Sequence, residues 1–138
     1  MKKVLFILAL AFTMQLSAQD KNNWITDYKV ALELSKTQDM PILAFVTDHQ
    51  KTEASEILNE VFFSSEAYKN IASQVVLLKV DISDSQSYNT RLGIHYLNKR
   101  STQGLALVNQ YNDKIGAPLI DFNAENIKSF ILLINSKL

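Results

Sequence analysis

The stretch "PILAFVTDHQKTEASEILNEVF", residues 41–62, decides the fold of this chain. Residues 42–46 form a short apolar run of branched and aromatic side chains, which predicts a central strand buried on both faces. From Lys51 the period becomes helical, and the apolar side chains that share one face are Ala54, Ile57, Leu58, Val61 and Phe62. The stretch is therefore a buried strand that leads into an amphipathic helix, with the polar segment 47–51 at the junction.

Upstream of this unit, residues 22–39 show a helical stripe made of Trp24, Tyr28, Ala31, Leu32 and Ser35. Downstream, the segment 63–65 interrupts the apolar stripe, and Ser65 is suited to cap a further turn or two through residue 70. We therefore expect a kinked or split helix. Residues 75–82, "VVLLKVDI", predict a second buried strand that ends near Asp81.

The remaining elements follow in order. Ser83 with Gln86 three residues later has capping-box spacing and predicts a helix with Tyr88, Leu92 and His95 on one face. A strand over 105–108, a turn over 109–113 and a short strand over 114–117 predict a hairpin. The C-terminal helix carries one stripe of Ile127, Phe130, Ile131 and Ile134.

This order defines the fold class. Strands separated by helices pair in parallel through right-handed crossovers, whereas the last two strands, joined by a tight turn, must be antiparallel. The prediction is an α/β protein: a three-layer α/β/α sandwich with a mixed, mainly four-stranded sheet.

The N-terminal residues predict export. Lys2 and Lys3 precede an apolar run over 4–12, and a polar stretch ends at the small residue Ala18. The run is about half of the roughly 20 apolar residues that a membrane-spanning helix needs. We therefore expect a signal peptide at residues 1–18, a domain at residues 19–138 with no membrane span, and a periplasmic or secreted location.

Composition excludes several classes. The 138 residues carry 14 basic and 14 acidic side chains, so no nucleic-acid footprint is indicated. The chain contains no cysteine, so it forms no disulfide and has no thiolate ligand for a metal. Packing alone must stabilise the fold.

With these residues in view, the chain resembles the thioredoxin-like superfamily, especially its small exported bacterial members. The blocks that carry the resemblance are "NWITDYKVALELSKTQDMPILAFVTD", "NEVFFSSEAY", "VVLLKVD" and "LALVNQYND", in this order and spacing. The resemblance implies that the family's C-x-x-C motif falls on residues 51–54, "KTEA". It also implies that the family's cis-proline falls at Gln103. Both positions are changed in this chain.

Without a thiol, thiol–disulfide exchange has no nucleophile. In the fold that the chain resembles, the groove between the two loops holds extended substrates through backbone hydrogen bonds, which require no cysteine. We therefore expect a noncatalytic module of the cell envelope that binds a protein or peptide, with no cofactor, metal or catalytic residue. The expected groove residues are Asp48, His49, Gln50, Lys51, Thr52, Ala54, Thr102, Gln103 and Gly104.

Two alternatives remain open. Asp48 beside His49 could serve a non-redox enzyme as a carboxylate–imidazole pair. We favour a simpler interpretation, in which Asp48 caps the following helix and His49 is solvated. His95, the other histidine, is expected to pack on its own helix. The second alternative is a structural or assembly subunit of an envelope complex.

Overall fold

The computed structural model describes residues 24–100 and 102–138, so the predicted signal peptide lies outside the described residues. Four strands form one sheet in the order β2-β1-β3-β4. Their bounds are β1 Ile42–Thr47, β2 Val76–Asp81, β3 Gly104–Val108 and β4 Lys114–Leu119. β1 is parallel to β2 and antiparallel to β3, and β3 is antiparallel to β4. The predicted mixed sheet is confirmed.

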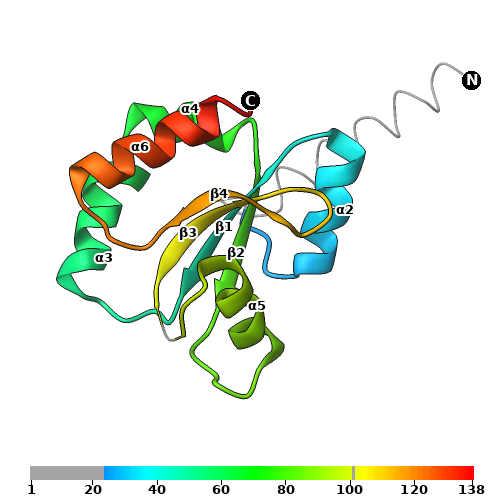
Figure 1. Ribbon diagram of the computed structural model, residues 1–138, viewed down its shortest axis with the longest axis horizontal. Coiled ribbons are helices and arrows are strands. Elements are labelled where there is room, and N and C mark those ends of the chain that lie inside the picture. Colours follow the sequence, from blue (N-terminus) through cyan, green and yellow to red (C-terminus); the bar gives the residue numbers. More distant parts are fainter. Residues whose placement is uncertain (1–23, 101) are drawn as a thin grey trace, which may run out of the picture.

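Helices cover both faces of the sheet (Figure 1). One face carries α3 Glu53–Ile57, the π-helix η1 Leu58–Phe63, α4 Glu66–Ala72 and α6 Ala124–Asn135. The other face carries α2 Tyr28–Gln38 and α5 Tyr88–Leu97. Two hydrophobic clusters, one under each helical layer, form the core. The three-layer α/β/α arrangement agrees with the sequence prediction.

β1 is the central parallel strand, as its unbroken apolar run predicts. Ala44 pairs with Leu78 of β2 on one side and with Ala106 of β3 on the other. Ile42 and Leu43, which point to opposite faces, are both fully buried. β1 therefore fixes the position of the polar segment that follows it.

β2 lies at an edge of the sheet, not at its centre, although its residues are almost all buried. The Ile25 backbone covers that edge: its N–H donates to Leu77 O and its carbonyl accepts from Lys79 N–H, both at 2.8 Å. A peptide segment that supplies ladder hydrogen bonds gives an edge strand the environment of an interior one. The apolar run alone could not distinguish the two positions.

Trp24 does not belong to the stripe of α2. The helix begins at Tyr28, where the Asp27 carboxylate caps it by accepting from Lys29 N–H at 2.9 Å. Trp24 packs instead on the opposite face of the sheet, with its ring centroid 6.1 Å from that of Phe45. The predicted stripe was therefore wrong at its first member, because the cap at Asp27 ends the helical periodicity there.

At the opposite edge, β4 is irregular. Leu105 pairs with Leu119 and Leu107 with Ile115, so β4 carries extra residues between these two pairs. Gly116 lies in this bulge with φ of 69°, and a Cβ there would lie 2.7 Å from Leu133. Glycine at this position both permits the positive φ and admits the side chain of α6.

The helix after β1 is split, as predicted, and Ser65 caps its last part by accepting from Tyr68 N–H at 3.1 Å. The predicted stripe was only partly right, because Ala54 and Val61 are exposed. The π-helix accounts for the exposure of Val61: its wider turn, closed by Ser64 N–H to Asn59 O at 3.0 Å, changes the direction of the side chains within it. Ala54 precedes the π-helix and lies in the exposed first turn of α3.

α5 begins later than the sequence predicted. Its N-cap is Ser87, and the proposed Ser83–Gln86 capping box does not form. The Asp81 carboxylate accepts from both the N–H and the hydroxyl of Ser83, so Ser83 is engaged by the end of β2. His95 contacts its own helix, with its ring centroid 5.6 Å from that of Tyr96, but it is exposed and its Nε2 also lies 2.8 Å from Asn112 O in the hairpin turn.

Candidate functional site

Two loops meet at one end of the sheet. The segment 48–52 leaves the end of β1, and residues 102–103 lead into β3. Because β1 and β3 are antiparallel neighbours, with Val46 opposite Gly104, the end of one strand lies beside the start of the other. The structure thus brings together the two segments that the sequence analysis assigned to one groove.

The side chain of Gln103 joins the two loops. Its Nε2 donates to Gln50 O at 3.0 Å, and its Oε1 accepts from Thr47 Oγ1 at 3.2 Å. Of the described peptide bonds none is cis, so the predicted cis-proline position holds a trans residue with a polar side chain. The loops are therefore connected by an amide.

Thr47 is the buried member of this connection, with 4% of its surface exposed. Its hydroxyl donates to Gln103 and accepts from His49 N–H at 3.0 Å. His49 adopts a positive φ of 64°, which is uncommon for a residue with a side chain. The threonine hydroxyl holds the backbone of His49 in this conformation.

The cap of α3 is Thr52, not Asp48. Thr52 Oγ1 accepts from Ser55 N–H at 3.1 Å, and Ser55 Oγ accepts from Thr52 N–H at 2.8 Å, which completes a capping box. Asp48 instead accepts from Gln50 N–H at 3.0 Å and closes a local turn. The expected cap was displaced because the chain makes this turn before the helix begins.

The other predicted groove residues differ in what they can offer a partner. Lys51 and Ala54 are exposed, and Thr102 is half-buried, with its hydroxyl donating to Arg100 O at 3.1 Å. Gly104 is buried, and a Cβ there would lie 2.7 Å from Leu119 O. Gly104 therefore permits the close approach of β4 and has no side chain to contact a ligand.

The imidazole of His49 contacts the carboxylate at the end of β2. Its Nε2 lies 3.1 Å from Asp81 Oδ2, and both side chains are about half exposed. Hydrogen bonds from the Ser83 hydroxyl and N–H, followed by His49, hold the pKa of Asp81 below its usual value. The imidazole thus pairs with Asp81 and not with the adjacent Asp48.

This pair does not complete a catalytic triad. Ser83 donates to Asp81, and no hydrogen bond joins its hydroxyl to His49 among the described contacts. A nucleophile must lie within hydrogen-bond reach of its base. In the described parts of the chain, no group of three His, Asp or Glu side chains is placed to hold a metal ion.

The sequence analysis missed Asp81 and Ser83 as neighbours of the loop. A signal was present: parallel strands end at the same edge of a sheet, and Thr47 pairs directly with Asp81. Any polar residue that ends β2 must therefore lie beside the segment that follows β1.

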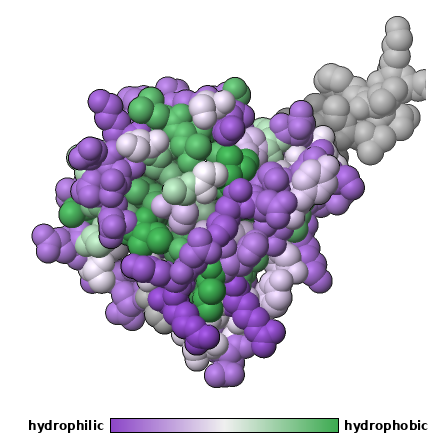
Figure 2. Space-filling view, viewed as in Figure 1, coloured by the Kyte–Doolittle hydropathy of each residue, from purple (hydrophilic) through white to green (hydrophobic). Residues whose placement is uncertain are grey.

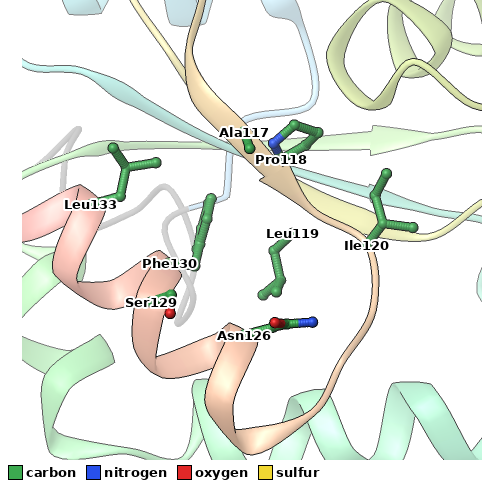
Figure 3. Close-up of a pocket in the computed structure, with 8 residues that line it drawn as sticks. All are labelled: Ala117, Pro118, Leu119, Ile120, Asn126, Ser129, Phe130 and Leu133. Atoms are coloured by element: carbon green, nitrogen blue, oxygen red, sulfur yellow. The ribbon is translucent and has the colours of Figure 1, made fainter.

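A second hollow lies between β4 and α6, with a volume of about 270 Å³ (Figure 3). Its lining is mostly apolar and includes Leu119, Phe130 and Leu133, and hydrophobic residues gather on this side of the molecule (Figure 2). The Asn126 amide at its rim already donates to Asp121 O at 3.2 Å. Its polar side chains, Asn126 and Ser129, are both exposed at the rim, so the hollow has the character of imperfect packing beside the β4 bulge.

Comparison with solved structures gives the class of the fold. The chain is similar to a protein described as DsbH oxidoreductase, with 19% identity, a TM-score of 0.61 and coverage of 81% of this chain and 83% of that one. It is also similar to a thioredoxin from Thermus thermophilus, with 13% identity, a TM-score of 0.65 and coverage of 86% and 90%. It is similar as well to the C-terminal domain of Neisseria meningitidis DsbD, with 12% identity, a TM-score of 0.62 and coverage of 83% of this chain and 99% of that one.

No family model matches the sequence, and no curated protein matches it. The structural similarities show that the chain has the thioredoxin-like fold, as its sequence blocks indicated. It is a version of that fold without cysteine. Within the residues that the structure describes, no helix is long and apolar enough to cross a membrane.

Proposed function

We propose that this protein is a noncatalytic thioredoxin-like module of the cell envelope that binds an extended peptide or protein segment at the two joined loops. The observation that carries the proposal is the Gln103 bridge, which holds segment 48–52 against residues 102–103 through Thr47 and Gln50. A preorganised polar surface of this kind loses little conformational entropy on binding.

The exposed residues beside the bridge provide the contacts. His49, Gln50, Lys51 and Thr52 are all exposed. The N–H groups of His49, Gln50 and Thr52 are bonded within the loop, whereas the Lys51 N–H and carbonyl have no partner among the described hydrogen bonds. Backbone groups at a loop suit an extended peptide, whose own N–H and C=O groups need partners. The absence of a thiol excludes thiol–disulfide exchange at this surface, and peptide binding is a function that requires no thiol.

The envelope location rests on the N-terminal sequence. Lys2 and Lys3, the apolar run after them and Ala18 are features of a cleaved export signal. The expected mature chain begins at Gln19, and mass spectrometry of the protein from fractionated source cells measures its first residue. A chain that retains Met1 would contradict export.

Site-specific photo-crosslinking in source cells tests the binding surface. A benzophenone amino acid replaces Gln50 in one variant and Lys51 in a second. A matched control carries it at Lys69, whose side chain is 66% exposed on α4. The expected result is one discrete adduct shared by positions 50 and 51 and absent at position 69. Equal labelling at all three positions, or no adduct at any, would refute the proposed surface.

A further inference from the structure

A hollow of about 270 Å³ lies where η1 and α4 face the covered edge of β2. It is lined by Trp24, Phe45, Asn59, Phe63, Tyr68 and Lys79. None of these residues belongs to the loops of the proposed peptide surface, so this hollow is a separate feature of the molecule.

Its walls are aromatic and held in tilted or edge-to-face contacts. The Phe63 centroid lies 6.0 Å from Trp24 at 79°, 5.2 Å from Phe45 at 60° and 5.1 Å from Tyr68 at 89°. Aromatic rings prefer such arrangements, and the lattice of contacts fixes each ring. A flat ring that enters the hollow meets preformed faces and edges.

The π-helix supplies one wall. Phe62 is fully buried in the core, whereas its neighbour Phe63 is half-buried and lines the hollow. A π turn contains more residues than an α turn, so successive side chains are closer in direction and both phenylalanines can face the sheet. Such insertions in helices occur frequently at functional sites.

Lys79 is the unusual residue of the lining. Its neighbours in β2, Leu78 and Val80, are buried on the face under α2 and α5, so Lys79 points to the opposite face. In the register of the sheet it pairs with Phe45 of β1. Its side chain is half-buried on the face that holds the hydrophobic cluster under η1. In the described part of the chain, its ammonium makes no ion pair, because the two pairs present are His49–Asp81 and Lys69–Glu66.

The other polar groups of the hollow are also able to donate. Burial raises the pKa of the Tyr68 hydroxyl, so the phenol keeps its proton at neutral pH. Asn59 contributes an exposed side-chain amide. The lining contains donors and a cation but no carboxylate, and a partly desolvated cation gains most from an anionic partner.

We propose that this hollow binds a small organic anion in which one planar ring carries a carboxylate, with the ring against Trp24 and Phe63 and the carboxylate on Lys79. The volume is below the roughly 300 to 1,000 Å³ of sites for drug-sized ligands, which suits a single ring. A free arylcarboxylic acid and the C-terminal aromatic residue of a peptide share this chemistry.

Trp24 is the only tryptophan of the chain, so its fluorescence reports on the hollow directly. Phenylacetate is titrated into the purified protein, with phenylacetamide as the neutral ligand of the same shape. The expected result is a saturable fluorescence change with phenylacetate and an affinity for phenylacetamide about tenfold lower, the difference that one charge-assisted contact provides. Equal affinities, or no saturable change, would overturn the proposal.

Lys79→Met keeps most of the apolar stem and removes the charge. It is expected to lower the phenylacetate affinity about tenfold and to leave the phenylacetamide affinity unchanged. Lys69→Met is the matched control and should change neither. If circular dichroism shows that Lys79→Met is unfolded, the role of charge is tested by comparing the affinities of phenylacetate and phenylacetamide for the wild-type protein. An unaltered phenylacetate affinity in folded Lys79→Met would contradict the assigned role of Lys79.

The two sources of the ligand are compared in the same assay. Gly-Gly-Phe with a free carboxylate is titrated beside its C-terminal amide and beside phenylacetate. Tighter binding of the peptide acid than of phenylacetate assigns the site to peptide C-termini, and weaker binding assigns it to free arylcarboxylic acids. Absence of saturable binding by both acids would refute the site, and it would leave the loop surface around Gln103 untested by the same measurement.

Discussion

Two substitutions that remove the hydrogen bonds of the Gln103 bridge should together lower the free energy of unfolding by less than the sum of their separate effects. Thr47→Val keeps the shape of the buried side chain but loses the bonds to His49 N–H and to Gln103 Oε1. Gln103→Leu loses the bonds to Thr47 Oγ1 and to Gln50 O. The bond between Thr47 and Gln103 is common to the two losses.

The expected magnitudes follow from the bond inventory. Each hydrogen bond contributes about 0.5 to 1.5 kcal/mol net, so each single change should lower the free energy of unfolding by about 1 to 3 kcal/mol. The double variant loses the shared bond once. The two costs should therefore fall short of additivity by about 0.5 to 1.5 kcal/mol, the contribution of one bond.

Urea unfolding measures these values, with Trp24 fluorescence and circular dichroism as two probes of one transition. The control combines Thr37→Ala with Gln103→Leu, because the Thr37 hydroxyl donates to Leu34 O in α2 and shares no partner with Gln103. That pair should be additive. If the Thr47 and Gln103 costs also add within about 0.3 kcal/mol, the two loops are not connected through this amide.

Four further outcomes are expected. The protein should reduce no insulin disulfide, and any turnover above buffer would contradict the need for a thiolate. Val80→Ala should lower the free energy of unfolding by about 1 to 3 kcal/mol in a urea melt, because Val80 is 1% exposed; a loss under about 0.5 kcal/mol would indicate a surface site. The double variant Thr52→Cys, Ser55→Cys should form a disulfide in air, because the side chains of Thr52 and Ser55 each bond to the backbone of the other residue and so lie close together. Thiol titration measures the result, and two free thiols in the folded protein would contradict the prediction. Because Ser83 lowers the pKa of Asp81, the stability that this carboxylate adds is present at neutral pH and is lost as pH falls below about 4. In urea melts at several pH values, Asp81→Asn should therefore reduce the loss of stability at acid pH, and an unchanged loss would contradict this role of Asp81.

The fold could be predicted because its elements are encoded by strong local periodicities. The buried run at residues 42–46 and the helical stripe at the C-terminus were placed correctly, since few other structures accommodate such patterns. The edge position of β2 could not be predicted, because the Ile25 backbone buries it as thoroughly as a neighbouring strand would. A pattern of buried residues shows that a strand is covered on its faces and edges, but it does not show which segment of the chain covers it.

The proximity of the two loops could be predicted, but their contacts could not. That segment 48–52 meets Gln103 follows from strand order, which the sequence implies. The choice of capping residue does not follow, because Asp48 and Thr52 are both residue types favoured at N-caps. The local turn at Gln50 decided between them. The pairing of His49 with Asp81 required the register of β1 and β2, which depends on the whole sheet.

The irregularity of β4 also affects how these molecules behave beside one another. A regular edge strand offers an open row of N–H and C=O groups on which a strand of another molecule can template, and this is a route to aggregation. Here Pro118 lacks an N–H, and the bulge at Gly116 interrupts the row. At the other side of the sheet, Ile25 already occupies the edge of β2. A chain with no disulfide to limit partial unfolding gains particular benefit from both edges being closed to intermolecular strand pairing.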